Sequence, residues 1–289
     1  MSAKVIEMLN LKQGGVYVDA TVGLGGHSEK ILHFIGPEGR LVGLDKDDAA
    51  LKLAADRLRD KRVSFRRGSF SDMEDLLALE GVSEVDGVLF DLGLSMLQLR
   101  DPDRGFSFTS EKRLDMRMDG TQKVSAWDVV NRCPEKEIDR ILWDFGEERL
   151  SRKIARAIIR LRGKRPIDTC SELSKIVEEV YAGRGRTHPA TKTFQALRIA
   201  VNRELDQLKE GLQAALRLLK EGGRLCVITY HSLEDRIVKR FFVDSSKKGA
   251  LRILTKKPVT PSVEETRGNP SSRSAKLRAA ERILCAKTV

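Results

Sequence analysis

The chain has 289 residues, and its 53 Lys and Arg against 42 Asp and Glu give a formal net charge of +11. No apolar run approaches the ~20 residues that span a bilayer, and the first residues lack an apolar signal segment. We therefore expect a cytoplasmic protein without a membrane partner. The excess of positive charge suggests a polyanionic partner, and a basic protein without one is the alternative. Neither the four cysteines nor the four histidines show the spacing of a metal site, so none is predicted.

Residues 16–28 contain the most informative pattern in the chain. Val16, Tyr17 and Val18 favour a strand, and glycines then follow at positions 23, 25 and 26. Apolar residues recur at helical spacing over 31–35. Strand, glycine loop and helix together predict the first crossover of a doubly wound α/β sheet, whose ligands bind beyond the carboxyl ends of the strands.

The glycine spacing and two acids indicate which ligand this loop binds. The glycine spacing does not match the dinucleotide fingerprint, because Ser28 stands at the position of the third glycine. Asp19 and Asp45 end the first two predicted strands, and an acid about 20 residues after the glycine loop can bind ribose hydroxyls. This arrangement resembles the nucleoside pocket of S-adenosylmethionine (SAM)-dependent methyltransferases. A phosphate-binding turn or a purely structural turn is the alternative.

The sequence up to residue 98 continues the alternation of strands and helices. Strands are predicted at 40–44, 63–67 and 85–90, and helices at 47–58 and after a capping box at 71–74. Phe70 is placed either to pack on a bound ring or to fill the core. Asp91 follows the fourth strand and should face the cleft, where it could accept a hydrogen bond from the cofactor or from a target amine; the alternative is a helix cap.

Between residues 101 and 202 the helical period dominates. The loop at 103–108 is predicted to expose its aromatic side chains, and the helix at 151–162 places four basic residues opposite its apolar face. We interpret this region as a helical insertion between strands four and five, with basic faces that neutralise phosphates. Solvated helix surface is the alternative, since acidic residues are interspersed.

The chain then returns to the sheet. A helix is predicted at 205–219, a turn at Gly222 and Gly223, and a fifth strand at 224–229. A helix through Phe242 and a strand at 251–255 follow. Helix propensity favours a helix at 277–284.

Several segments together resemble one family, the RsmH (MraW) type of 16S ribosomal RNA methyltransferases. The match covers nearly the whole chain. The segments are Asp19-Ala20-Thr21 with the glycine loop and His27-Ser28, Gly43-Leu44-Asp45, Asp91-Leu92-Gly93 with Ser95 and Gln98, Gly105-Phe106-Ser107-Phe108, His188-Pro189-Ala190 with residues 194–198, Tyr230 to Arg236, and Asn269-Pro270 with residues 272–278.

The resemblance implies a Rossmann-like class I SAM methyltransferase sheet with an inserted all-helical domain. Its parts would be a methyltransferase domain at 1–100 and 203–289, and an RNA-recognition insertion at 101–202. It implies methylation of the N4 amine of a cytidine in 16S rRNA, at the decoding centre of the small ribosomal subunit. It makes the last segment an antiparallel strand, against helix propensity, and it leaves open a homodimer.

The resemblance also assigns site residues. The implied cofactor site consists of Gly23, Gly25, Gly26, His27, Asp45, Phe70, Asp91 and Gln98. Asp91 and His231 are our catalytic candidates: Asp91 or an adjacent backbone carbonyl would accept a hydrogen bond from the amine, and His231, near the flipped base, could take the proton. A structural histidine is the alternative for His231. The substrate-binding candidates are Arg104, Phe106, Phe108, His188, Arg198 and Arg236.

Three rival functions differ in class or target. A DNA cytosine-N4 methyltransferase would need an Asn/Ser/Asp-Pro-Pro-Tyr/Trp run after strand four, and the chain has none. A dinucleotide-dependent oxidoreductase would be protected against heat by NAD and not by SAM. A non-catalytic RNA-binding factor would bind RNA without methyl transfer.

Overall fold

The computed structural model describes residues 1–181 and 188–283. The chain divides into two compact units, which are described separately. The sheet unit comprises residues 1–93 and 205–289, and the helical unit comprises residues 94–204. Within the described ranges, no helix is both long and apolar enough to cross a bilayer.

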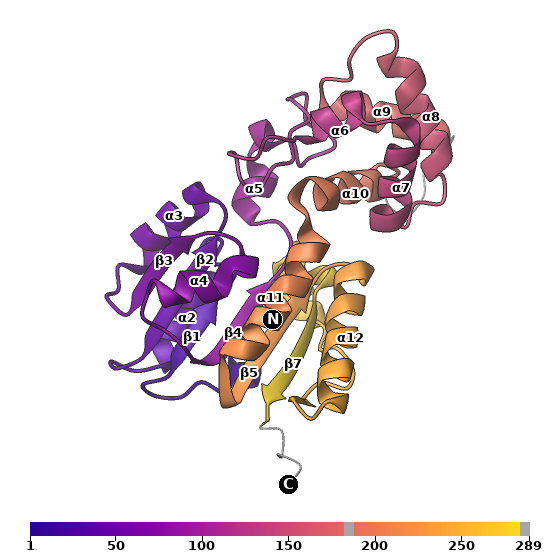
Figure 1. Ribbon diagram of the computed structural model, residues 1–289. Coiled ribbons are helices and arrows are strands. Elements are labelled where there is room, and N and C mark those ends of the chain that lie inside the picture. Colours follow the sequence, from indigo (N-terminus) through magenta and orange to yellow (C-terminus); the bar gives the residue numbers. More distant parts are fainter. Residues whose placement is uncertain (182–187, 284–289) are drawn as a thin grey trace. The chain divides into compact units, whose positions relative to one another are not determined.

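A seven-stranded sheet forms the centre of the sheet unit (Figure 1), with the strand order β3-β2-β1-β4-β5-β7-β6. Strands β3, β2, β1, β4 and β5 are parallel to one another, and β7 pairs antiparallel with both β5 and β6. Because the order reverses between β1 and β4, their carboxyl ends border the crevice in which such sheets bind ligands. The strands are β1 Val16–Asp19, β2 Arg40–Asp45, β3 Val63–Arg67, β4 Val85–Asp91, β5 Leu219–Thr229, β6 Leu251–Ile253 and β7 Lys276–Arg282.

The sheet is buried on both faces because its central strands are apolar at consecutive positions. Val88 and Phe90 of β4 belong to the core that helices α4, α11 and α12 cover, whereas Leu89 belongs to the core on the side of α1 and α2. A small third cluster lies under α3. The helices of this unit are α1 Ser2–Leu9, α2 Gly26–Phe34, α3 Asp48–Leu58, α4 Met73–Ala78, α11 Glu204–Leu218, α12 Ser232–Lys247 and α13 Val263–Gly268.

The helical unit has a core of its own, to which its helices and the 106–118 loop contribute. The Asn202 side chain holds that loop in place with two hydrogen bonds of 2.8 Å. It accepts one from the Met118 N–H and donates the other to the Met116 carbonyl. The helices are α5 Met96–Arg100, α6 Ala126–Arg132, α7 Glu135–Gly146, α8 Ser151–Arg162, α9 Cys170–Tyr181 and α10 Thr191–Asn202.

Most predicted elements are confirmed, including the last strand, and three details are wrong. Residues 276–282 form a strand, as the resemblance implied, because pairing with β5 and β6 overrides helix propensity; position 284 lies outside the described residues. Residues 222 and 223 lie within β5, which begins at Leu219. The capping box at 71–74 does not form, since Ser69 caps a 3₁₀ turn there instead. The aromatic side chains at 103–108 are not all exposed, because Phe106 is buried in the helical core.

Candidate functional site

The glycine loop and Asp45 form one connected structure at the carboxyl edge of the sheet. Asp45 ends β2, and its carboxylate accepts hydrogen bonds from the Gly23 N–H at 2.9 Å and the Asp47 N–H at 3.0 Å. Gly23 and Gly25 have φ angles of 52° and 77°, the left-handed region that glycine occupies at little cost. A Cβ at Gly25 would also approach Leu58 to 3.2 Å. The loop therefore needs these glycines to reach the start of α2.

The Asp45 carboxylate retains acceptor capacity for a ligand. A carboxylate has about four lone-pair sites, and the two backbone N–H groups occupy two of them. The others can accept from the paired hydroxyls of a ribose, as the sequence predicts. Burial raises the pKa of Asp45, and hydrogen bonds from Asp47 and Gly23 only partly oppose this shift. The residues at this edge thus fit the ribose of SAM.

Asp91, at the end of β4, is the centre of a second hydrogen-bond network. The Tyr230 hydroxyl donates to Asp91 Oδ1 at 2.9 Å, and His27 Nε2 lies 3.5 Å from Oδ2. The backbone N–H of Asp91 donates to Thr21 Oγ1 at 2.6 Å. The Asp91 side chain is 27% exposed, so its carboxylate is held on several sides and still open to a ligand.

His27 connects this network to a buried carboxylate. Asp19 is fully buried and accepts from the Ser28 hydroxyl at 2.7 Å; burial raises its pKa. Burial alone would lower the pKa of His27, but the hydrogen bond and charge of Asp91, with the charge of Asp19, outweigh it and raise that pKa. His27 Nδ1 is buried without a partner among the described residues. The imidazolium form is thus favoured between two carboxyl groups.

Tyr230 and Thr21 are site residues that the sequence prediction did not select. Both stood inside segments of the family resemblance, but their contacts with Asp91 join strands β1, β4 and β5 and cannot be read from spacing. Tyr230 also packs against Gly93, where a Cβ would lie 3.4 Å from the ring. Gly93 has a φ of 98°, so a side chain there would be strained. Burial, followed by the charge of Asp91, strongly raises the pKa of Tyr230, which stays a hydrogen-bond donor.

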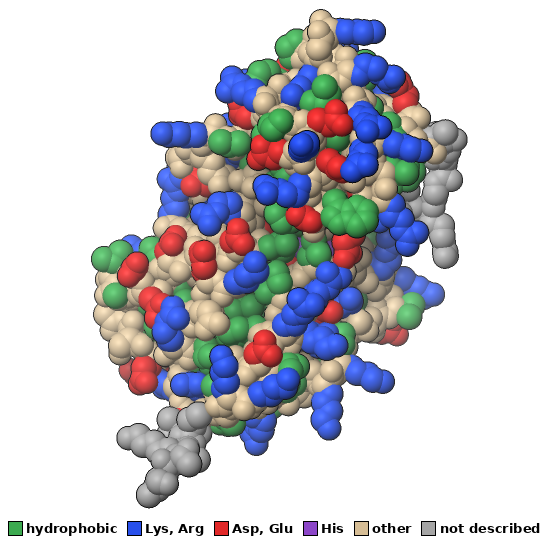
Figure 2. Space-filling view, turned by 45° about the vertical axis from the view of Figure 1, so that its right-hand side comes forward, with side chains coloured by type: hydrophobic (Ala, Val, Ile, Leu, Met, Phe, Trp, Pro, Cys, Tyr) green, Lys and Arg blue, Asp and Glu red, His purple; other side chains and the backbone are tan. Residues whose placement is uncertain are grey.

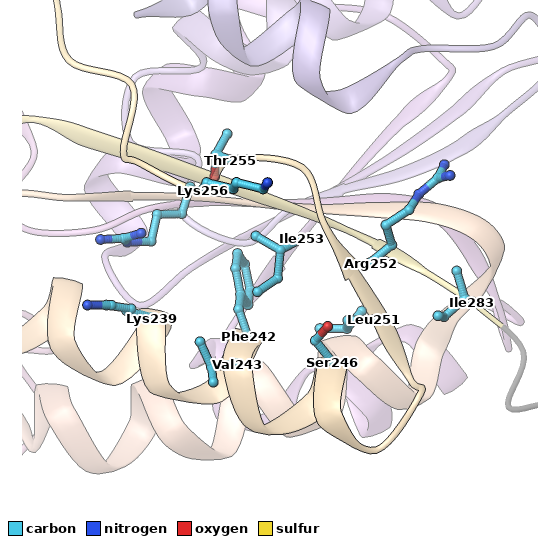
Figure 3. A pocket seen from close by; sticks show the side chains of 11 residues that line it. Lys239, Phe242, Val243, Ser246, Leu251, Arg252, Ile253, Thr255, Lys256 and Ile283 are labelled. Carbon is cyan, nitrogen blue, oxygen red and sulfur yellow. The ribbon is translucent and has the colours of Figure 1, made fainter.

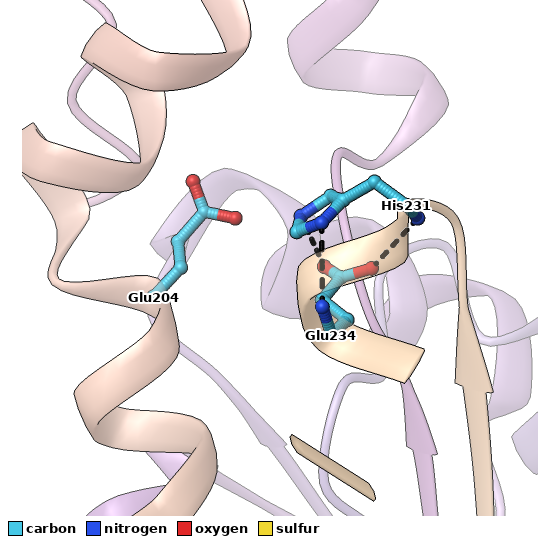
Figure 4. A group of neighbouring side chains, drawn as sticks. All are labelled: Glu204, His231 and Glu234. Atoms are coloured by element: carbon cyan, nitrogen blue, oxygen red, sulfur yellow. Dashed lines mark hydrogen bonds and ion pairs between the residues drawn. The ribbon is translucent and has the colours of Figure 1, made fainter. Parts of the chain in front are cut away.

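His231 caps α12 at the carboxyl end of β5. Its Nδ1 accepts from the Glu234 N–H at 3.4 Å, and Nε2 lies 3.1 Å from Glu234 Oε1 (Figure 4). Glu234 in turn accepts from the backbone N–H groups of Tyr230 and His231. Glu234 therefore fixes the loop that carries Tyr230, and His231 has a clear structural task whether or not it takes part in catalysis.

Phe70 packs within the sheet unit. Its ring meets Phe90 edge to face at 5.2 Å, and the Lys46 ammonium lies 5.5 Å from its centroid. A Cβ at Gly211 of α11 would come within 2.7 Å of the ring, so only glycine allows this approach. Stacking on an adenine stays a prediction.

Six predicted residues belong to the helical unit, and their local contacts are structural. Gln98 forms a capping box with Ser95. Arg104 donates to two backbone carbonyls of the 117–118 segment, and Phe106 is in the core. Phe108 stacks on His188, with 4.1 Å between the ring centroids. Arg198 makes a bidentate ion pair with Glu204. The sixth substrate candidate, Arg236, is an exposed residue of α12.

Comparison with known proteins identifies the family. The model of the MraW methylase family matches residues 1–283. The chain belongs to the MraW methylase family. It is 50% identical over 285 residues to "Ribosomal RNA small subunit methyltransferase H" of Persephonella marina, covering 97% of both chains. It is 47% identical to the protein of the same name from Caldicellulosiruptor saccharolyticus, covering 94% of both.

The predicted methyltransferase class, its Rossmann-like fold and SAM as methyl donor are confirmed by this membership and by the sheet order. A dinucleotide-dependent oxidoreductase is inconsistent with it. Among solved structures, fibrillarin from Aeropyrum pernix in complex with SAM is similar at 13% identity and a TM-score of 0.44, covering 96% of this chain and 72% of that one.

Proposed function

We propose that this MraW-family methylase transfers a methyl group from SAM to the N4 amine of a cytidine in 16S rRNA, at the decoding centre of the small ribosomal subunit. The curated relatives carry the name of a ribosomal RNA small subunit methyltransferase. The observation that carries the proposal is the Asp91 network beside the glycine loop. The reaction would take place in the cytoplasm.

Asp45 and the glycine loop would hold the adenosine part of SAM. Asp45 offers acceptors to the ribose hydroxyls, and the backbone at Gly23 and Gly25 lets the nucleoside approach closely. SAM supplies a methyl group on a sulfonium, which is a good leaving group. The chain's main task is therefore to align the reactants, and alignment can contribute roughly 7–11 kcal/mol.

Asp91 would assist the target amine. The cytosine amine is a weak nucleophile because its lone pair is delocalised into the ring. An acceptor for one of its N–H bonds favours the pyramidal geometry of attack, and the Asp91 carboxylate is fixed by Tyr230 and the Thr21 contact for this task. His231 is the proposed partner of the flipped base, and its imidazole is the proposed acceptor of the proton that the amine loses.

The helical insertion would recognise RNA. Residues 94–204 contain 23 Lys and Arg against 17 Asp and Glu, so this unit is basic overall. The substrate candidates Arg104, Phe108 and His188 make contacts within the helical unit. In this proposal, those contacts hold neighbouring residues in place on the RNA-binding surface.

The test is methyl transfer from labelled SAM to small subunits isolated from cells that lack this protein. Nucleoside mass spectrometry should find N4-methylcytidine, and Asp91→Asn should lower the transfer rate at least 10-fold with SAM affinity retained. Asp86→Asn is a matched control, since Asp86 lies in the same strand and pairs with Lys220 at 2.9 Å. Label on another base would refute the N4 assignment, and an active Asp91→Ala variant would remove Asp91 from the mechanism.

A further inference from the structure

A groove outside the Asp45–Asp91 edge opens between α12 and β6. It has a volume of about 480 Å³, within the range of small-ligand sites. Figure 3 shows Phe242 and Ile253 facing each other across it, with Lys239 at one end and Arg252 and Ile283 toward the other. Its floor is apolar, and its rim is cationic.

Two cations of the rim make no close ion pair among the described residues, and the charge of one of them, Lys239, acts on Asp235 at longer range. Arg252 pairs with Glu281, and Arg278 is held by Asp235 at 2.7 Å. Lys239 and Lys256 are exposed, and within residues 1–181 and 188–283 no carboxylate lies within 4.0 Å of either ammonium. These two side chains can therefore bind an external anion without breaking an existing pair.

The charge of the whole segment supports an anionic partner. Residues 232–283 contain 13 Lys and Arg against 6 Asp and Glu, whereas residues 1–93 contain 12 against 16. Lys and Arg side chains are spread over the lower part of Figure 2, where the α12 side of the sheet unit is turned forward. The positive charge of the sheet unit is thus concentrated in the segment that forms this groove, and four of its cations line it.

The directions of α12 and β6 show which end of the groove lies nearer the carboxyl edge of the sheet. α12 begins directly after β5, and Lys239 lies in the first half of that helix. β6 runs parallel to β5, because both pair antiparallel with β7. Lys256 follows the carboxyl end of β6, so both lysines lie at the end of the groove that is nearer the carboxyl edge of the sheet, while Arg252 and Ile283 lie at the other end.

We propose that this groove binds a single-stranded segment of RNA next to the methylated nucleotide. One unstacked base lies against the partly exposed Val243 and Ile253, above the buried Phe242, and its flanking phosphates lie on Lys239 and Lys256. Bases contribute an apolar face and phosphates a regular negative charge, which is the combination that such a groove accepts. This inference rests on the proposed function, since it takes RNA as the substrate.

The test uses the full-length protein with Lys239→Ala/Lys256→Ala and Lys239→Glu/Lys256→Glu. The matched control is Lys52→Glu/Lys61→Glu, two exposed lysines of the acidic part of the same unit. Binding of naked single-stranded 16S fragments and of small subunits is measured with the methylation kinetics and with SAM affinity.

In the Lys239→Glu/Lys256→Glu variant, we expect the RNA affinity to fall at least 10-fold and the KM for RNA to rise at least 10-fold. The kcat and the SAM affinity should stay within two-fold of wild type. The Ala pair should reduce the slope of log K against log salt by about 1.4, at roughly 0.7 per phosphate contact on a single strand. The control pair should change KM less than three-fold.

Other outcomes overturn the proposal. Equal losses in the groove and control pairs would mean that only net charge matters. A loss with small subunits and none with naked RNA would assign the groove to an acidic protein segment. A wild-type protein that binds RNA through the groove and transfers no methyl would refute the proposed function and leave the groove assignment standing.

Discussion

Replacing Asp45 by Asn should weaken SAM binding by roughly 10- to 150-fold. The carboxylate accepts from the Gly23 and Asp47 N–H groups and keeps two further acceptor sites. Asn keeps one carbonyl oxygen and turns the other position into an NH2 group, which cannot accept a hydrogen bond from a ribose hydroxyl. The loss is one hydrogen bond to a charged acceptor, roughly 1.5–3 kcal/mol, which corresponds to that range of Kd.

Titration calorimetry with SAM measures the effect, and thermal unfolding of the ligand-free variant separates it from damage to the loop. Asp48→Asn is the control: this neighbour is 56% exposed, pairs with Arg67 at 3.0 Å and should change SAM affinity less than two-fold. Asp45→Asn with an unchanged SAM Kd and a lowered Tm would mean that Asp45 only braces the glycine loop.

Three further predictions follow from the same contacts. Tyr230→Phe should lower kcat about 10-fold at unchanged SAM affinity, because Asp91 loses its 2.9 Å donor; an unchanged kcat would contradict the role of this contact. Burial raises the pKa of Asp45, so calorimetry should find weaker SAM binding as the pH falls through this raised pKa, while proton uptake by this group favours the folded state; Asp45→Asn should remove the contribution of this group to the pH dependence. Asn202→Ala should destabilise the helical unit by about 2–4 kcal/mol in urea unfolding, since two buried backbone groups lose their partner; a loss below 1 kcal/mol would show that water replaces it.

Local patterns of the sequence predicted most of the sheet unit. The strand at 85–91 is recognisable because a buried parallel strand is apolar along its whole length, and the loop at 23–26 because only glycine adopts its backbone angles cheaply. These features depend on neighbours in the chain. The acids that end β2 and β4 were therefore found from spacing alone.

Tertiary packing decided the rest. Residues 276–282 favour a helix by composition and form a strand because β5 and β6 offer paired edges on both sides. Tyr230 becomes part of the site only because β5 lies beside β4 and brings its hydroxyl to Asp91, 139 positions away in the chain. The groove over Phe242 and its two lysines likewise arises from a helix and a strand that meet in space. Sequence spacing determines what a residue can do locally, and strand order determines which residues meet.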